Sequence, residues 1–419
     1  MRIPLRCAWG AAAAWLLVTA TAHAQGDLPH PLSLTQARDS ARRHSPELKA
    51  ARSGVQGAAG RERQAAAWPN PTLGYGREQA SREGESNAQD ILSLEQPFEL
   101  GGQRAARRAA ARSAREAAEA REAAGAARLD YEVVRAYAGA VAAGRRAALA
   151  AAAADAFERA AAVSRTRLAG GDVSGYQHRR LTLETARYAA LEAEARVVRD
   201  SAIGLVASLT GVGDGPGSLV LTDTLPLGPL PLAADSLAAL ALARSPDLRA
   251  AVLEVEVAAA ESRLSRAERV PTPVLMGGYK HERTTAGGSL GGFVAGVSLP
   301  LPLWDRRGGA VEAARAATEQ REAEVEALRR HTAREVRAAF GAYQALAEQL
   351  EALRSALGDE ALRARRAAES AYAEGEIGLL EWLDSVRAYQ EAETTFATLQ
   401  AEYIARRAAL ERATGATLF

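Results

Sequence analysis

The chain repeats its own landmarks 200 positions apart, from Ser45 to Ser245. The segment SPELKAA at 45–51 returns as SPDLRAA at 245–251. Four more pairs follow in the same order: Pro69-Asn70-Pro71 with Pro271-Thr272-Pro273, Leu92–Phe98 with Val297–Leu303, Gly171-Asp172-Val173 with Gly375-Glu376-Ile377, and Thr210-Gly211 with Thr414-Gly415. A period this long excludes solenoids, whose repeats have about 20 to 50 residues. The sequence therefore predicts one structural unit that has been duplicated.

The first 24 residues are typical of a secretory signal peptide. Arg2 and Arg6 provide the positive start, residues 8–20 form the apolar stretch, and Ala22-His23-Ala24 is a small-residue cleavage site before Gln25. We therefore expect the mature chain to be exported. An uncleaved membrane anchor is the alternative, but the apolar stretch is short for a span of about 20 residues.

Cysteine and charge narrow the possible functions. The single cysteine, Cys7, lies inside the signal and away from its cleavage site, so we expect no lipid-linked cysteine, disulfide or thiolate ligand in the mature chain. Loss of Arg2 and Arg6 with the signal lowers the formal net charge by two, from +1 to −1. Nucleic acid is not expected as a partner, because there is no basic field to attract it.

Both copies predict the same order of elements: a helix, a strand hairpin, a long helix, a turn and a second helix. The first copy covers 25–210 and the second 233–419, with a linker rich in glycine and proline at 211–232. Predicted helices occupy about 34–68, 103–170, 174–209, 235–269, 306–373 and 379–413. Predicted strands occupy about 72–79, 89–96, 274–283 and 289–299.

The predicted helices are polar and rich in alanine. They cannot stand alone, because a helix gains most of its stability by packing an apolar face. Alanine permits close approach, so we expect the helices to lie side by side in a coiled-coil-like layer. A fibrous spacer would explain the helices but not the hairpins. After the signal, no segment approaches 18 uninterrupted apolar residues, so no membrane-spanning helix is predicted.

The hairpin strands alternate apolar residues with small or polar ones, as in Phe293–Ser298. Their lengths are near the roughly 9 to 11 residues that cross a bilayer. A soluble sheet would alternate in the same way, but export and the lack of another core favour a membrane. Four strands cannot close a barrel, and lipid does not tolerate open edges. Two chains would give eight strands and a filled interior, whereas three would give twelve and a water-filled lumen.

Three phrases carry a resemblance to a known family. Tyr372–Asp384 (YAEGEIGLLEWLD) resembles the tyrosine-glycine turn and the leucine-aspartate helix start of the TolC-like outer-membrane efflux proteins. The resemblance covers essentially the whole mature chain. Gln96–Arg104 (QPFELGGQR) and Ser298–Arg306 (SLPLPLWDR) are similar to the branch that serves heavy-metal pumps, of the CzcC and CusC kind.

The resemblance implies a mainly α fold with a membrane β-barrel, in which a homotrimer forms a twelve-stranded outer-membrane barrel on a twelve-helix periplasmic tunnel. It implies the exit duct of a tripartite efflux pump for heavy-metal cations, without a cofactor. The implied partners are a periplasmic adaptor (membrane fusion protein) and an inner-membrane transporter of the RND type. Drug efflux or type I secretion through the same fold is one alternative. A periplasmic adaptor or structural coiled-coil protein is another, although an adaptor would have one helical hairpin rather than two.

The resemblance also implies functional residues. Glu381, Asp384 and Tyr372 would form a periplasmic gate. The adaptor would contact the two helical turns, at Gly171, Val173, Ser174, Gly375, Ile377, Gly378 and Leu379. Both sets have a plainer explanation, since acids suit any helix start and glycine suits any reversal between helices. The arginine and aspartate that latch the family's gate match Ile377 and Gln177, so we expect this latch to be missing.

No catalytic or metal-binding constellation is predicted. The histidines after the signal are scattered, at His30, His44, His178, His281 and His331, and Met276 is the only methionine there. His178 could form a three-fold ring in a trimer, whereas a solvated helix histidine is the simpler interpretation. Because titratable groups do not converge on one place, we do not expect an enzyme.

Overall fold

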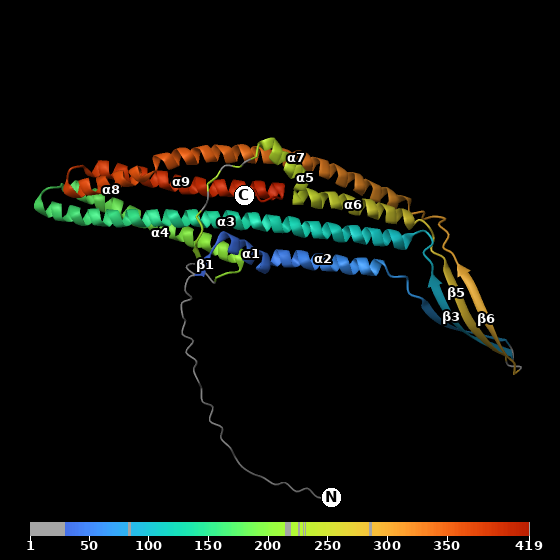
Figure 1. Cartoon of the computed structure of the whole chain (residues 1–419). Coiled ribbons are helices and arrows are strands. Elements are labelled where there is room, and N and C mark those ends of the chain that lie inside the picture. The colour runs from blue at the N-terminus through green and yellow to red at the C-terminus, as the bar shows by residue number, and fades with distance from the viewer. Residues whose placement is uncertain are drawn as a thin grey trace, which may run out of the picture.

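A computed structural model describes residues 30–82, 85–213, 219–224, 227–228, 230, 232–284 and 287–418. The predicted signal peptide at 1–24, its cleavage site between Ala24 and Gln25, and parts of the predicted linker lie outside these residues. Figure 1 shows a long layer of helices with a β-sheet at one end.

The described elements follow the same order in both halves of the chain. The first half contains β1 (His30–Leu32), α1 (Leu34–His44), α2 (Pro46–Ala65), β2 (Thr72–Arg82), β3 (Glu85–Pro97), α3 (Gln103–Gly170) and α4 (Gly175–Thr210). The second half contains β4 (Leu219–Leu221), α5 (Ala234–Arg244), α6 (Pro246–Ala267), β5 (Val274–Thr284), β6 (Ser289–Ser298), α7 (Gly308–Ala356), α8 (Asp359–Glu374) and α9 (Leu379–Thr414). This order confirms the duplicated unit of helix, hairpin, long helix and helix.

The helix that opens each half is broken in two, so the prediction of one continuous helix was wrong. The breaks fall at Ser45 and Ser245, whose ψ angles of 122° and 124° are extended. Pro46 and Pro246 cause them, because proline disfavours helical backbone at the residue before it. Each serine Oγ then accepts a hydrogen bond from the backbone N–H three residues on, at 3.2 Å and 3.4 Å. These bonds cap α2 and α6.

The last helix of each half ends at a glycine in the left-handed conformation. Gly211 has a φ of 65° and Gly415 a φ of 63°. Glycine is favoured there because other residues pay a steric penalty. A Cβ at Gly415 would also lie only 2.5 Å from the carbonyl oxygen of Arg244. The repeated Ser-Pro and Thr-Gly landmarks are therefore helix caps.

The long helix of the second half is interrupted, although it was predicted to run continuously over 306–373. After α7, the backbone N–H of Leu357 donates to the carbonyl of Leu353 at 2.8 Å. Gly358 is extended, with a ψ of −177°, and α8 begins at the next residue. Its counterpart α3 is one helix of 68 residues, about 100 Å long at ~1.5 Å per residue. The two halves therefore differ on the approach to their last turn.

α3 lies at the centre of the helical layer. It contacts α2 and α6 toward the sheet, and α4 and α9 toward the opposite end. Long polar helices thus gain their stability by packing side by side. In the described part of the chain, no helix is both long and apolar enough to cross a membrane.

The two hairpins form one antiparallel sheet in the order β2-β3-β5-β6. β3 pairs with β5, so the sheet joins the two halves, and β2 and β6 are its edges. β2, β3 and β5 extend beyond their predicted ranges, whereas β6 ends at Ser298, one residue before its predicted end. One cross-strand row places Tyr75, Leu92, Tyr279 and Phe293 next to one another on the same face. All four side chains are exposed in the single chain.

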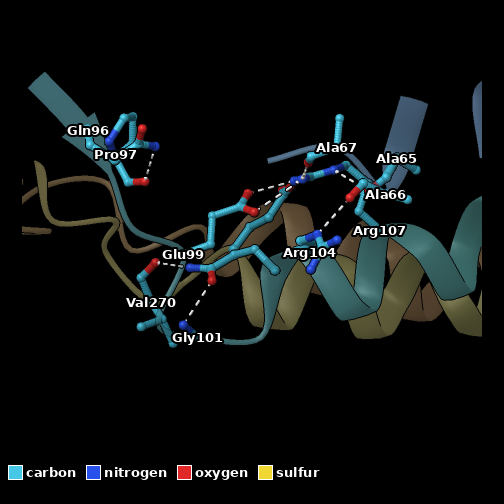
Figure 2. A network of polar contacts seen from close by, with 12 residues as sticks. Ala65, Ala66, Ala67, Gln96, Pro97, Glu99, Gly101, Arg104, Arg107 and Val270 are labelled. Atoms are coloured by element: carbon cyan, nitrogen blue, oxygen red, sulfur yellow. Dashed lines mark hydrogen bonds and ion pairs between the residues drawn. The ribbon is translucent and has the colours of Figure 1, made fainter. Parts of the chain in front are cut away.

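A polar network fastens the sheet to the helices (Figure 2). Arg107 forms an ion pair with Glu99 at 2.6 Å. Arg104 Nε donates to the carbonyl of Ala66 at 2.7 Å, closing the end of α2. The carbonyls at a helix end lack partners within the helix, so these arginines satisfy them. The QPFELGGQR phrase at 96–104 supplies Glu99 and Arg104 and therefore has a structural function at this junction.

In each half, a tyrosine on the long helix hydrogen-bonds to the chain segment that precedes the first helix of that half. Tyr137 on α3 donates to the carbonyl of Leu32 at 2.8 Å, and Tyr343 on α7 donates to that of Gly228 at 2.7 Å. Tyr403 stacks on Tyr343 with ring centroids 4.6 Å apart. Burial, reinforced by the Tyr403 hydroxyl, raises the pKa of Tyr343 far above its usual range.

Candidate functional site

The predicted gate and docking residues lie at the end of the helical layer farthest from the sheet (Figure 1). There α3 turns into α4 and α8 turns into α9, and we call these two turns, 170–175 and 374–379, the tips. Gly171 and Gly375 end the incoming helices with φ angles of 83° and 87°. Both reversals therefore need glycine for the left-handed conformation.

The residues predicted to dock an adaptor differ in exposure. Four are exposed: Gly171, Ser174, Gly375 and Gly378. Val173 and Ile377 are half-buried, and Leu379 is buried in an apolar cluster behind the tips. Leu379 therefore supports the turn from within instead of presenting a surface. The docking role of the tips stays a prediction.

The two positions that match the family's latch have other partners here. Ser174 Oγ accepts from the backbone N–H of Gln177 at 3.2 Å, and Gln177 Oε1 accepts from that of Ser174 at 3.1 Å. This reciprocal pair is a capping box at the start of α4. Ile377 packs against the apolar cluster behind the tips.

Arg167 connects the two tips directly. Its guanidinium, on the last turns of α3, donates to the main-chain carbonyls of Tyr372 at 3.2 Å and Ala373 at 2.7 Å, on the last turn of α8. A Cβ added to Gly375 would lie 3.0 Å from Arg167 Nη2. We call this contact the tip clasp. No sequence pattern predicts this contact, because its acceptors are main-chain atoms.

Four aromatic rings, one from each helix, stack behind the tips. Phe157 on α3 stacks on Tyr188 of α4 at 4.0 Å between ring centroids. Trp382 on α9 lies 4.8 Å from Phe157 and 5.0 Å from Tyr372 on α8. Tyr372, predicted as a gate residue, is thus part of a buried core, and burial raises its pKa. Trp382 is 1 % exposed, and its Nε1 has no hydrogen-bond partner within the described residues.

The two predicted gate acids lie on the outside of α9. Glu381 and Asp384 are both exposed, and within the described ranges neither carboxylate has a hydrogen bond or ion pair. Glu381 lines a groove of about 620 Å³ between α8 and α9, together with Ile377 and Tyr389. The described residues contain no group of three His, Cys, Asp or Glu that could hold a metal ion. An anionic ring formed by several chains stays a prediction.

His178 points toward α3 of its own chain. Its Nδ1 lies 3.1 Å from Ser164 Oγ, and Ser164 is buried. The imidazole therefore fills the contact between α3 and α4 instead of standing free in solvent. This contact between His178 and Ser164 differs from both expectations, a three-fold ring and a solvated side chain.

Ion pairs between the halves reinforce the same end of the molecule. They join a helix of the first half to one of the second, at Arg145–Glu393 (2.6 Å), Arg159–Glu369 (2.8 Å) and Arg387–Glu184 (2.8 Å). No sequence signal distinguishes them, because the chain holds 52 lysines and arginines and 51 acids. Tertiary packing alone selects these partners.

Comparisons with known proteins identify relatives. Residues 237–416, most of the second half, match the family model of the outer membrane efflux proteins. The nickel and cobalt resistance protein CnrC of Cupriavidus metallidurans is 28 % identical over 305 residues, which are 72 % of this chain and 70 % of that protein.

Solved structures share the fold across almost the whole chain. The Campylobacter jejuni CmeC outer membrane channel matches with a TM-score of 0.76 at 16 % identity, covering 91 % of this chain and 85 % of that one. CusC, whose crystal structures concern transmembrane channel formation, matches with a TM-score of 0.74 at 18 % identity and covers 94 % of both chains. The predicted fold class, that of the TolC-like outer-membrane channels, is confirmed.

Proposed function

We propose that this chain, whose residues 237–416 match the family of outer membrane efflux proteins, is the outer-membrane exit duct of a tripartite efflux pump for heavy-metal cations. The observation that carries the proposal is the position of the sheet. A four-stranded sheet with one apolar face lies at one end of the helical layer (Figure 1), whose central helix is about 100 Å long. The sheet crosses the membrane, and the helices extend into the periplasm.

The duct is a homotrimer in this proposal. A sheet with two open edges is not stable in lipid, because backbone groups there would lack partners. Among the described strands, β2 and β6 are such edges. Three copies pool twelve strands and enclose a water-filled lumen, with Tyr75, Tyr279 and Phe293 on the lipid side.

The pump partners are a periplasmic adaptor (membrane fusion protein) and an inner-membrane transporter of the RND type. The adaptor meets the exposed parts of the tips. Glu381 and Asp384, repeated in three copies, form the gate. The tip clasp of Arg167 holds that gate closed until the adaptor separates the helices.

Heavy-metal cations are the proposed cargo. CnrC, which aligns with 72 % of this chain, is a nickel and cobalt resistance protein. The exposed carboxylates of Glu381 and Asp384 would favour cations at the periplasmic entrance. A duct needs no tight metal site, so the inner-membrane partner supplies the selectivity.

A deletion strain tests the proposal. Its tolerance of nickel, cobalt, detergents and antibiotics should be compared side by side. We expect sensitivity to the metals, restored by the intact gene but not by a variant that lacks Thr72–Gln96, because the sheet cannot then close. Sensitivity to detergents and antibiotics alone would instead identify a drug duct of the same fold.

A further inference from the structure

We propose that the lipid-facing side of the sheet carries a binding site for the phosphate groups of an anionic glycolipid in the outer leaflet of the membrane. Arg77, His281 and Arg283 form this site around Asp90, and we call the four residues the cationic cluster. The inference rests on the proposed outer-membrane position of the sheet and adds a ligand that the duct function does not require.

Strand register places the cluster on the same face as the aromatic row described above. Arg77 lies opposite Asp90, and Asp90 lies opposite His281. Each of these residues is two positions from a member of the aromatic row on its own strand, and residues two apart share a face of a sheet. Arg283 follows two positions later on β5. The cluster therefore begins about 7 Å from the aromatic row, on the side away from the helices.

The aromatic row marks the boundary of the apolar surface. In barrels that cross the outer membrane, aromatic side chains flank the apolar band at both interfaces. Tyr75 Oη donates to Asp90 at 2.7 Å, and a Cβ added to Gly291, opposite His281, would collide with Tyr279 Oη. Both hydroxyls thus reach from the aromatic row toward the cluster. In the proposed duct the cluster lies at the depth of the lipid headgroups.

One carboxylate organises two guanidinium groups. Arg283 Nη2 donates to Asp90 Oδ2 at 2.6 Å. Arg77 Nη1 lies 3.8 Å from Asp90 Oδ1, which is too far for a hydrogen bond. The side chains of Arg77 and Arg283 are 52 % and 57 % exposed, whereas that of Asp90 is 19 % exposed. A guanidinium has five N–H donors, so most donors of both arginines remain available to a ligand.

The cluster holds more positive charge than its own acid can neutralise. Two arginines and a histidine surround Asp90, which is the only acid on this face among the described residues of the four strands. One arginine would be enough for an ordinary ion pair. The second arginine leaves a net positive charge beside the hydrocarbon region, and this charge favours a bound anion because hydrocarbon cannot solvate it.

The opposite face of the same strands has the opposite charge. Its described side chains include Glu78, Glu95 and Glu282 but only one base, Lys280. Glu282 accepts a hydrogen bond from Asn87 at 2.6 Å and pairs with Lys280 at 3.4 Å. The face that would line the lumen is therefore anionic, and the positive excess is confined to the face toward lipid. This separation favours a membrane ligand over a transported ion as the partner of the cluster.

Phosphate groups on a glycolipid fit these donors. The outer leaflet of an outer membrane contains glycolipids whose sugar phosphates lie at headgroup depth. Arginine binds phosphate oxygens through two parallel hydrogen bonds, with charge on both partners. The acyl chains of the same molecule would lie along the aromatic row, where Phe293 is 93 % exposed and Tyr279 is 47 % exposed. Because the lipid makes both contacts, we expect it to bind more tightly than free inorganic phosphate.

Native mass spectrometry of the mature protein, extracted from outer membranes and freed of lipid, tests the site by titration with lipid A that carries both of its phosphates. We expect wild type to bind this lipid even in EDTA, because guanidinium groups need no bridging metal ion. Arg77→Gln with Arg283→Gln should weaken binding by about tenfold or more, since two charged contacts are lost. Lys280→Gln is the matched control and should bind as wild type, because it removes a positive charge beside His281 but from the opposite face.

Three further comparisons separate phosphate recognition from other attractions. Dephosphorylated lipid A has the same acyl chains and should bind as weakly to wild type as the phosphorylated form binds to the double glutamine variant. Millimolar inorganic phosphate should leave lipid A bound. Arg77→Lys with Arg283→Lys keeps both charges but loses the paired hydrogen bonds of the guanidinium, so its affinity should lie between those of wild type and the double glutamine variant.

Four outcomes would overturn the inference. Equal affinity of wild type and the double glutamine variant for lipid A would exclude the site, and equal affinity for dephosphorylated lipid A would exclude phosphate recognition. Loss of binding in EDTA would assign the lipid to a metal ion bridged by Asp90. Displacement by millimolar phosphate would indicate a site for free phosphate.

Two checks keep these outcomes separate from folding and from the proposed function. The same spectra report the mass of the oligomer, and the single variants Arg77→Gln and Arg283→Gln replace the double variant if it fails to assemble. If the wild-type chain does not fractionate with the outer membrane, the proposed duct fails, whichever lipid the purified protein binds.

Discussion

Arg167, near the end of α3, donates a hydrogen bond of 2.7 Å to the main-chain carbonyl of Ala373, on the last turn of α8. The carbonyls of a last helical turn have no partners within their own helix. A side chain of the first half thus caps the C-terminal end of a helix of the second half, next to the candidate gate residues. In the proposed gate, this contact would take the place of the arginine-aspartate latch that the sequence lacks.

Removing the clasp should loosen the gate. Arg167→Ala deletes two charged hydrogen bonds, each worth about 1.5–3 kcal/mol when buried and less at this partly exposed site. We expect the variant to occupy open, high-conductance states more often in planar bilayers. Arg165→Ala removes a nearby exposed arginine and should behave as wild type. Unchanged conductance in Arg167→Ala would exclude a gating role for the clasp.

Gly375→Ala should act on the same contact. The φ of 87° disfavours alanine by roughly 1–2 kcal/mol, and the new Cβ would press on Arg167 Nη2 at 3.0 Å. The conductance of the double variant with Arg167→Ala should therefore be non-additive. Gly378→Ala is the matched control, because nothing lies within 4 Å of its added Cβ. Fully additive effects would separate Gly375 from the clasp.

The aromatic cluster predicts a contrast between two substitutions at Trp382. Trp382→Ala removes a buried ring that joins two other rings, so local stability should fall by about 3–5 kcal/mol. Trp382→Phe keeps a ring and removes an indole N–H that has no partner in the described structure, so its cost should be much smaller. Hydrogen exchange at 150–190 and 365–390 measures both. Equal protection in the two variants would contradict the packing argument.

Neutralising the proposed gate acids should change ion selectivity. Two charges ~6 Å apart at an effective dielectric of ~20 repel by roughly 2.8 kcal/mol, so a ring of carboxylates favours bound cations. Glu381→Gln with Asp384→Asn should weaken block by trivalent cations and lower cation preference, with the oligomer unchanged. Glu391→Gln, an exposed acid farther along α9, should do neither. If trivalent cations block the double variant as strongly as they block wild type, the two acids are ordinary helix-start residues without a role in ion selectivity.

The buried Tyr343 predicts sensitivity to alkali. Because the folded-state pKa of Tyr343 is raised, its contribution to stability is complete below its unfolded pKa of about 10 and is lost as the pH rises above that value. Thermal unfolding from pH 8 to 11 should show this loss. Tyr343→Phe should reduce the alkaline loss, while costing about 1 kcal/mol at neutral pH through the missing hydrogen bond to Gly228. An alkaline profile identical to wild type would assign the loss to other groups.

Features that depend on a few neighbouring residues could be predicted from the sequence. Ser45 and Ser245 cap helices, and Gly171 and Gly375 end them, because local backbone preferences dictate both. The strand faces followed from alternation, since side chains of a strand point to opposite sides. The breaks at Pro46 and Pro246 are also encoded locally, because proline disfavours helical backbone at the residue before it.

Only the tertiary structure decided which of many similar side chains became contact partners. Sequence gives no reason for Arg145 to pair with Glu393 or for Arg167 to bind main-chain carbonyls, since arginines and acids occur on every helix. Phe157, Tyr188, Tyr372 and Trp382 meet because four helices converge at one height behind the tips. Local sequence determined each helix, its ends and the strand faces. The order in which the helices lie side by side, and how far each is shifted along its axis, determined the contacts between their side chains. Packing of the helices brings together residues that are hundreds of positions apart in the sequence.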